Sequence, residues 1–275
     1  MVEKTTLVLT NRDQEQIVCD VRMPAGGRRR PAVVIFHSFM AFKDWGWFPF
    51  AGERIAEEGF VSVIANFSRN GVTESPFRIT DFATFERNTV SHELADAKTI
   101  LEAVVGGDVG HVDSTRVAVL GHSRGGGIAI LIAAQSEDVR AVVTWSSVCT
   151  FDRWSPHQKE QWRRRGFLPL SRDTEASPLR LGLDLLEDVE SNGETLDLLK
   201  ASARLRKPWL ILHGREDLLV KLGEAERLYS ASHRATTEFF PLDHTGHTYG
   251  GPEVTDDSPV HAVLDRTIDW LKRHV

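Results

Sequence analysis

From residue 31 onward, short apolar segments alternate with segments in which apolar residues recur at helical spacing. This alternation restricts the chain to few architectures. The predicted strands are 31–36, 61–66, 116–120, 141–145, 209–213 and 237–240. The predicted helices are 50–58, 91–105, 125–134, 222–232 and a final helix with an apolar face from Val260 to Leu271. Strands that are apolar throughout are typical of a parallel sheet, because helices cover both of its faces. We therefore predict an α/β fold with a mostly parallel central sheet and helices on both faces.

The residues before this alternation predict an N-terminal antiparallel hairpin. Strand-like runs at 5–10 and 15–23 are separated by the polar turn Asn11-Arg12-Asp13, and two runs joined in this way are typical of a hairpin. At the start of the final helix we expect Ser258 to cap the free amides and Pro259 to occupy the first turn.

The composition excludes several classes of protein. Of the 275 residues, 41% are hydrophobic and 26% are charged, which is typical of a globular domain and unlike a disordered chain. We expect a single domain over residues 1–275, because α/β folds commonly reach this length around one sheet. The formal charge of −6 offers no basic surface for a nucleic-acid partner.

No apolar run in the sequence approaches the roughly 18 residues of a membrane span, and the first residues lack the basic and apolar parts of a secretory signal. We therefore expect a cytoplasmic protein that does not bind membranes. Cys19 and Cys149 both lie in apolar segments, so two buried thiols are preferred to a disulfide or a cysteine metal site. The sequence leaves the oligomeric state open, with a homodimer among the alternatives.

One segment interrupts the alternation of strands and helices. Residues 150–207 contain two tryptophans, three consecutive arginines and two helical patches, at 181–189 and 195–203. A segment of this length is too long for a simple loop in a compact domain. We interpret it as a helical insertion over the sheet. It is either a lid or a peripheral decoration without substrate contact.

The segment from Val117 to Gly127 carries the strongest chemical signal. It contains Gly121-His122-Ser123-Arg124-Gly125, a G-x-S-x-G motif directly between a predicted strand and a predicted helix. A sharp strand-to-helix turn needs glycine on both sides of the serine, because neighbouring backbone approaches with no room for a Cβ. We predict that Ser123 is a nucleophile. The alternatives are a tight turn without chemistry and a phosphate-binding loop that lacks the usual lysine.

A serine hydroxyl needs a base to activate it, and the base needs a carboxylate to orient it. The loop after the strand at 209–213 supplies Asp217, with Glu216 as the competing acid. The Gly-rich loop before the final helix supplies His247, with His244 as the competing base. We predict Asp217 and His247. A metal site at His244-x-x-His247 is disfavoured, because no third ligand with recognisable spacing accompanies it.

Two amide donors are also needed to stabilise the oxyanion of a tetrahedral intermediate. The main chain of Arg124, which follows the nucleophile, is the first candidate, and that of Phe39, in the loop after the strand at 31–36, is the second. Three tryptophans, Trp45, Trp154 and Trp162, are expected to bind substrate in an apolar or aromatic acyl pocket. These aromatic side chains can equally belong to the core.

Taken together, these segments resemble the α/β-hydrolase superfamily from residue 31 to 275. They are similar to dienelactone-hydrolase-like and cinnamoyl-esterase-like bacterial serine hydrolases. The segments that carry the resemblance are His37-Ser38-Phe39, Lys43-Asp44-Trp45, Asn66-Phe67-Ser68, Gly121-His122-Ser123-Arg124-Gly125, His213-Gly214-Arg215-Glu216-Asp217 and Gly246-His247-Thr248-Tyr249-Gly250.

The resemblance implies that Ser123, Asp217 and His247 form a catalytic triad, that Phe39 and Arg124 supply the oxyanion hole, and that no cofactor is needed. The chain departs from the family pattern in two places. Dienelactone hydrolases proper carry a cysteine at the position of Ser123, which argues against lactone ring opening. The glycine that usually follows the first loop histidine is Ser38 here, which puts the oxyanion role of Phe39 in question.

The sequence thus predicts a carboxylic ester hydrolase that acts on a small-molecule ester through an acyl-enzyme intermediate. Hydrolysis of an amide, peptide or thioester, or acyl transfer, would use the same three residues. A non-catalytic ligand-binding module is the alternative from another class, because a fold does not determine its function.

Overall fold

An eight-stranded sheet organises the part of the chain that the computed structural model describes, which is residues 1–73, 75–170, 178–251 and 253–275. The strand order is β1-β2-β4-β3-β5-β6-β9-β10. The strands are β1 (Val2–Thr10), β2 (Gln16–Pro24), β3 (Arg30–Phe36), β4 (Val61–Ala65), β5 (Val112–His122), β6 (Val139–Trp145), β9 (Trp209–Gly214) and β10 (Thr237–Leu242). Within this sheet, the pairs β1–β2 and β2–β4 are antiparallel and the other pairs are parallel. The sheet is therefore mostly parallel, as predicted, and β1 and β2 form an antiparallel pair at one edge.

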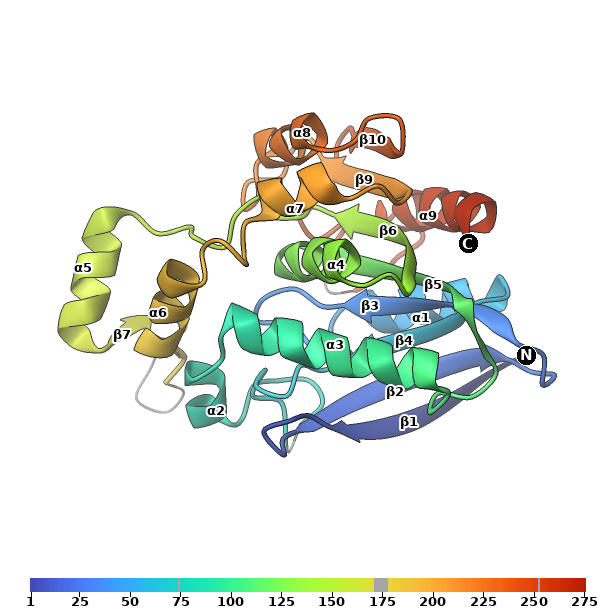
Figure 1. Ribbon diagram of the computed structural model, residues 1–275, viewed down its shortest axis with the longest axis horizontal. Coiled ribbons are helices and arrows are strands. Elements are labelled where there is room, and N and C mark those ends of the chain that lie inside the picture. Colours follow the sequence, from blue (N-terminus) through green and yellow to red (C-terminus); the bar gives the residue numbers. More distant parts are fainter. Residues whose placement is uncertain (74, 171–177, 252) are drawn as a thin grey trace.

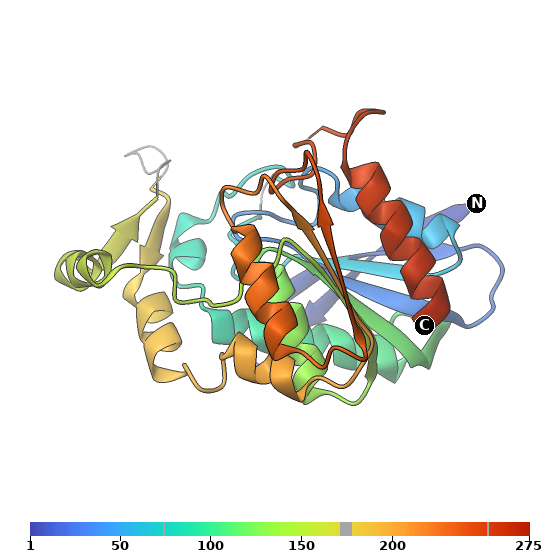
Figure 2. The same ribbon diagram turned by 90° about the horizontal axis from the view of Figure 1, so that it is seen from above.

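Helices cover both faces of this sheet (Figures 1 and 2). The helices α3 (Val90–Gly106), α4 (Arg124–Gln135) and α8 (Leu222–Ala231) share one core with the sheet. The helices α1 (Phe48–Glu57) and α9 (Val260–His274) share the other. Within β3, Val34 belongs to the first core and Val33 to the second. Because successive side chains of a strand point to opposite faces, a strand buried on both faces reads as one continuous apolar run.

The start of α9 corrects one prediction. The helix begins after Pro259, and no side chain caps it. Ser258 Oγ instead accepts a hydrogen bond from the Thr255 main-chain amide at 2.9 Å. The carbonyl of Pro259 accepts from Val263 N at 3.2 Å, so the proline occupies the capping position that the sequence assigned to its neighbour. Cys19 and Cys149 are buried free thiols, as predicted.

The described first part of the segment 150–207 extends beyond one end of the sheet (Figure 2), whereas its last helix packs against α4 and α8. It contains α5 (Pro156–Arg165), β7 (Phe167–Pro169), β8 (Arg180–Gly182), α6 (Leu183–Ser191) and α7 (Leu198–Arg204). The helices α6 and α7 correspond to the two predicted helical patches. Residues 171–177 of the predicted insertion lie outside the described residues.

The sequence analysis missed two helices. In α5 only Trp162 is buried, so the helix has no apolar stripe to reveal its period. Its start did carry a signal, because Ser155 and Gln158 form a reciprocal capping box. The other, α2 (Phe82–Glu86), is a five-residue helix. Among the described helices, none combines the length and the apolar character needed to cross a bilayer.

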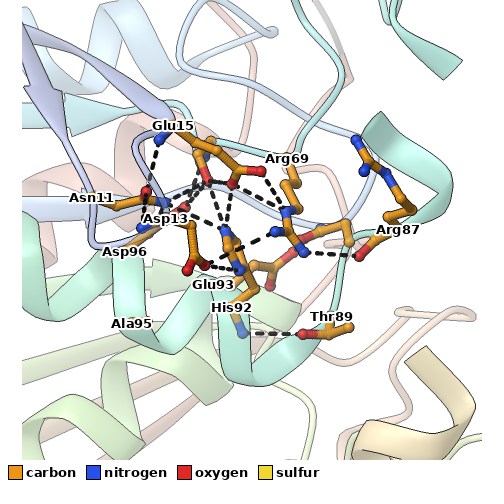
Figure 3. A network of polar contacts seen from close by, with 12 residues as sticks. Asn11, Asp13, Glu15, Arg69, Arg87, Thr89, His92, Glu93, Ala95 and Asp96 are labelled. Atoms are coloured by element: carbon orange, nitrogen blue, oxygen red, sulfur yellow. Dashed lines mark hydrogen bonds and ion pairs between the residues drawn. The ribbon is translucent and has the colours of Figure 1, made fainter. Parts of the chain in front are cut away.

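A network of polar contacts joins the turn of the β1–β2 hairpin to α3 and to the loop after β4 (Figure 3). Asp96 on α3 is completely buried. It accepts hydrogen bonds from Asn11 Nδ2 at 2.9 Å, Ser68 N at 2.7 Å and Ser68 Oγ at 2.7 Å. Nearby, Glu15 accepts from Arg69 Nε and contacts His92 Nε2 at 2.8 Å. The network fixes the hairpin against the rest of the sheet through buried, paired groups.

Removal of the Asp96 carboxylate should destabilise the fold strongly. Asp96→Ala leaves Asn11 and the Ser68 amide without their buried acceptor, and we expect a loss of about 3 kcal/mol in the free energy of unfolding. The matched control is Asp265→Ala, which removes an exposed carboxylate 3.3 Å from Arg54 and should cost less than about 0.5 kcal/mol. Urea denaturation followed by circular dichroism measures both. Equal effects of the two substitutions would show that the network does not anchor the hairpin.

Candidate active site

Ser123 lies at a strained turn between β5 and α4. Its backbone has φ 56° and ψ −118°, and the helix begins at the next residue. Non-glycine residues rarely adopt such positive φ values, and the strain persists only where the surroundings enforce it. A Cβ on Gly121 would lie 2.0 Å from the carbonyl oxygen of Gly125, and one on Gly125 would lie 2.4 Å from the carbonyl oxygen of His37. Glycine is therefore required on both sides of Ser123, as the motif predicts.

Hydrogen bonds hold this turn in place. Ser123 N donates to Trp145 O on β6 at 2.9 Å, and Ser123 O accepts from Gly126 N at 3.0 Å and from Val148 N at 3.3 Å. The backbone is thus tied to the neighbouring strand and to its own helix. Its side chain is 8% exposed and faces a cavity at the carboxyl edge of the sheet.

The loops after β9 and β10 bring Asp217 and His247 together. His247 Nδ1 lies 2.7 Å from Asp217 Oδ2, while Asp217 Oδ1 accepts from Leu219 N at 2.9 Å and Val220 N at 2.8 Å. Burial acts to raise the pKa of Asp217, but the hydrogen bond and charge of His247 hold that pKa below its usual value. An ionised Asp217 places the proton of neutral His247 on Nδ1, which leaves Nε2 as the basic nitrogen.

His247 and Ser123 line the same cavity. Within the described residues, no hydrogen bond joins the Ser123 hydroxyl to His247. Such contacts are often long in free enzymes and tighten when substrate binds. The structure therefore brings all three predicted residues to one edge of the sheet, with the acid–base pair already formed.

The competing acid and base pair with each other at the surface. His244 Nδ1 lies 3.3 Å from Glu216 Oε1, and the His244 side chain is 94% exposed. Neither residue lines the cavity of Ser123. Among the described residues, the group with metal-ligand geometry is Asp13, Glu15 and His92, which includes neither His244 nor His247. In that group Arg69 Nε already donates to both oxygens of Glu15 and supplies the positive charge.

Two buried histidines that the sequence analysis did not identify support the acid and the base. His122 Nε2 donates to His247 O at 2.9 Å, and the two imidazole rings lie 4.7 Å apart. His213 Nε2 donates to Val220 O at 2.7 Å, next to the amides that bind Asp217. Burial lowers the pKa of both, that of His122 to about 3, so both stay neutral donors. Each lies at the carboxyl end of a buried strand, His122 in β5 and His213 in β9, which was the available signal.

The two candidate oxyanion donors also reach the cavity. Phe39 and Arg124 both line it. Within the described residues, turns, loops and helix caps contain no main-chain hydrogen bond donated by either amide. The loop that carries Phe39 is fixed by His37, whose Nδ1 donates to Ser38 O at 2.9 Å and whose Nε2 accepts from Phe67 N at 3.3 Å. Burial lowers the pKa of His37 to about 4. The oxyanion role of the two amides remains a prediction.

The cavity has a volume of about 530 Å³, within the range of small-molecule sites. Trp45 and Trp154 line it, as predicted. Trp162 does not. It is fully buried behind Trp154, with the two rings 4.9 Å apart, so its expected contact with substrate is corrected to a supporting role. The remaining walls are mostly apolar and come from both the sheet loops and the segment 150–207: Met40, Val90, Val148, Phe151, Leu181, Leu185, Leu219 and Val220. That segment therefore contributes directly to the cavity.

Comparison with known proteins gives one family and many structural neighbours. The model of the dienelactone hydrolase family matches residues 20–163, a region that contains Ser123 and ends before Asp217 and His247. A search of curated protein sequences finds no match to this chain.

The structural neighbours share the fold at low sequence identity. Est1E of Butyrivibrio proteoclasticus, solved with ferulic acid bound, has a TM-score of 0.75 and 16% identity over 98% of each chain. The α/β hydrolase GrgF of Penicillium sp. sh18 has a TM-score of 0.74 and 17% identity over 99% of each chain. An esterase of Pyrococcus furiosus has a TM-score of 0.66 and 17% identity, over 99% of this chain and 91% of its own. The α/β-hydrolase fold expected from the sequence is confirmed.

The strain at Ser123 should be measurable as a reversal of the usual preference for alanine over glycine. Because a positive φ is tolerated by glycine, Ser123→Gly should be more stable than Ser123→Ala by about 1 kcal/mol. At Ser230, an exposed residue of α8, the order should be the opposite by a similar amount, because glycine weakens helices. Thermal denaturation of the four variants tests this. If Ser123→Ala is the more stable of its pair, the turn is not strained.

Proposed function

The chain belongs to the dienelactone hydrolase family, and from this premise we propose that it is a serine esterase that cleaves carboxylic esters of small molecules through an acyl-enzyme intermediate. The observation that carries the proposal is that His247, whose Nδ1 lies 2.7 Å from Asp217, lines the same cavity as a serine held at a strained strand-to-helix turn. A nucleophile, a base and an orienting acid are the three parts that acyl transfer by serine requires.

In the proposed reaction, Ser123 Oγ attacks the acyl carbonyl carbon while His247 Nε2 accepts the hydroxyl proton. The tetrahedral intermediate collapses when the bond to the alcohol oxygen breaks, and the imidazolium returns the proton to that oxygen. Water then attacks the acyl-enzyme by the same route, with His247 again as the base, and releases the acid and the free serine. Atoms and protons balance without a cofactor.

Asp217 orients the imidazole and stabilises its charged form in this scheme. The Leu219 and Val220 amides hold Asp217 Oδ1, which leaves Oδ2 directed at His247. The negative charge of the intermediate develops close to the start of α4, where free amides and the helix dipole favour an anion. The main-chain amides of Arg124 and Phe39 are the proposed donors to that oxygen.

The cavity favours an apolar or aromatic acyl group. Its walls include Phe39, Trp45, Phe151 and Trp154, and ligand sites of this kind are mostly apolar with few polar groups. The Butyrivibrio neighbour binds an aromatic acid, ferulic acid, in the same fold. A serine in place of the family's cysteine distinguishes the proposed activity from lactone ring opening. Amide and thioester hydrolysis remain alternatives that a substrate panel separates.

Labelling with a fluorophosphonate probe tests the nucleophile and the base together. We expect the label on Ser123, none in Ser123→Ala and almost none in His247→Ala. Because the wrong tautomer of the base is then favoured, Asp217→Asn should lower kcat for an ester by about 10⁴-fold. His244→Ala is the matched control and should retain labelling and turnover. Label on another serine, or equal loss in both histidine variants with intact folds, would refute the assignment.

The pH profile should report the base alone. A general base must be neutral to accept a proton, so activity should rise with pH when it is measured from about pH 5 to about pH 8. His122, with its pKa lowered to about 3, is neutral throughout this interval, and Asp217, with its pKa below the usual value, stays ionised. The measurement is kcat/KM against pH. A flat profile would exclude an imidazole base.

A further inference from the structure

The side chain of Arg124 is a charged group inside an otherwise largely apolar cavity. Its main-chain amide is proposed for the oxyanion above, but the guanidinium is a separate feature. Arg124 lines the cavity, and its side chain is 11% exposed. A charge in such a position costs free energy unless it is paired and hydrogen-bonded.

The guanidinium is held rigidly on one side. Nε donates to Glu93 Oε2 of α3 at 2.9 Å, and the Phe39 ring lies against the group, with 5.2 Å from the guanidinium carbon to the ring centroid. Glu93 is in turn held by Asn88 Nδ2 at 2.7 Å. Phe39, Glu93 and Asn88 therefore fix the position of Arg124 before any substrate binds.

The other two nitrogens of this guanidinium have no partner. Among the described residues, only Nε of Arg124 takes part in a hydrogen bond or ion pair, and Nη2 is a buried atom without an acceptor. Nη2 is therefore closed to a ligand, whereas Nη1 also lacks a partner and is not such a buried atom. An unpaired donor in apolar surroundings is costly, so Nη1 offers a bound oxygen acceptor a favourable site. The second arginine of the cavity differs, because Arg153 Nη1 donates to Glu224 and Nη2 to Leu219 O.

The charge around Arg124 distinguishes between a neutral and an anionic acceptor. Glu93 already compensates the positive charge and is itself buried. Burial raises the pKa of Glu93, although Arg124 opposes this effect, which indicates that the site accommodates one carboxylate at a cost. A second carboxylate, brought by the substrate, would face Glu93 with no further positive charge to pair with.

We propose that Arg124 is a specificity-determining residue that donates a hydrogen bond from its free Nη1 to a neutral oxygen of the acyl chain. Within the proposed esterase function, on which this inference rests, the preferred substrates are esters whose acyl group is apolar except for one uncharged ether, hydroxyl or carbonyl oxygen at a distance from the scissile bond. The apolar walls bind the carbon chain, and Arg124 selects the oxygen.

A set of isosteric esters tests the proposal. The reference is 4-nitrophenyl hexanoate. Its neutral analogues have an ether oxygen in place of one methylene at successive chain positions, and its anionic analogue is a chain of equal length that ends in a carboxylate. Each kcat/KM is divided by the rate of hydroxide-catalysed hydrolysis of the same ester to remove differences in intrinsic reactivity. We expect one ether analogue to exceed hexanoate by about tenfold in the wild-type protein, and the anionic analogue to fall below it.

Two variants, Glu93→Gln and Glu93→Gln combined with Arg124→Met, differ only at residue 124 and show whether Arg124 causes these preferences. Glu93→Gln preserves an acceptor for Arg124 Nε, and Asn88 Oδ1, which is buried without a partner, can receive the new amide. With the compensating charge gone, the anionic analogue should gain about tenfold relative to hexanoate. In Glu93→Gln combined with Arg124→Met, both the ether preference and the anionic gain should disappear. Arg153→Met is the control within the cavity and should keep the ether preference.

The outcomes separate the inference from the function on which it rests. If no ester is hydrolysed by a folded protein, the proposed function fails. If the esters are hydrolysed but the ratio of ether analogue to hexanoate is the same in both Glu93→Gln backgrounds, Arg124 does not select the acyl oxygen. An anionic analogue that is already preferred by the wild-type protein would overturn the neutral-acceptor assignment and leave Arg124 as an anion site. Thermal denaturation of each variant confirms that the comparisons are made between folded proteins.

Discussion

The backbone of Ser123 is the constraint on which the site depends. A residue at φ 56° is unfavourable by itself, and here hydrogen bonds to the neighbouring strand β6, to the loop after it and to the first turn of α4 hold it in place. The turn held in this way also lifts the side chain above the sheet. The packing of the core thus determines the position of one hydroxyl oxygen. The stability of the whole fold compensates for the backbone strain at this residue.

Parallel topology explains how distant residues reach that oxygen. The strands β3, β5, β9 and β10 all run in one direction, so the loops that follow them meet at one edge of the sheet. Behind this edge lies a layer of neutral buried histidines, His37, His122 and His213, each of which uses a ring nitrogen to hold a main-chain carbonyl. Because burial lowers the pKa of all three, they remain uncharged supports beside groups that must change their charge.

The features that the sequence could predict are those that repeat a local rule. Strands buried on both faces are visible as apolar runs, and Gly121 and Gly125 mark the turn because no other residue fits there. Strand topology then places Asp217 and His247 at the right edge. Contacts across the fold have no local rule, which is why the ion pair between Arg124 and Glu93 and the support from His122 could not be anticipated.

Two predictions were wrong and helix α5 was not predicted, because several local sequence signals apply to the same residues and only one of them determines the structure. Ser258 has the chemistry of a helix cap, but the Thr255 amide takes its hydroxyl and Pro259 takes the capping position. Trp162 was expected to bind substrate because it is aromatic, but its ring packs against Trp154 and it does not line the cavity. Helix α5 buries one side chain only, so its period was hidden although its capping box was readable.

The cavity is assembled from two sources with different constraints. Its floor consists of loops at the sheet edge whose geometry the core dictates, whereas part of its wall, including Trp154, Leu181 and Leu185, comes from the segment 150–207, whose described first part extends past the end of the sheet (Figure 2). We expect substitutions in that wall to change the shape of the cavity without moving Ser123, the proposed nucleophile. Substitutions in this wall can therefore alter which substrates fit the cavity while the reaction chemistry stays the same.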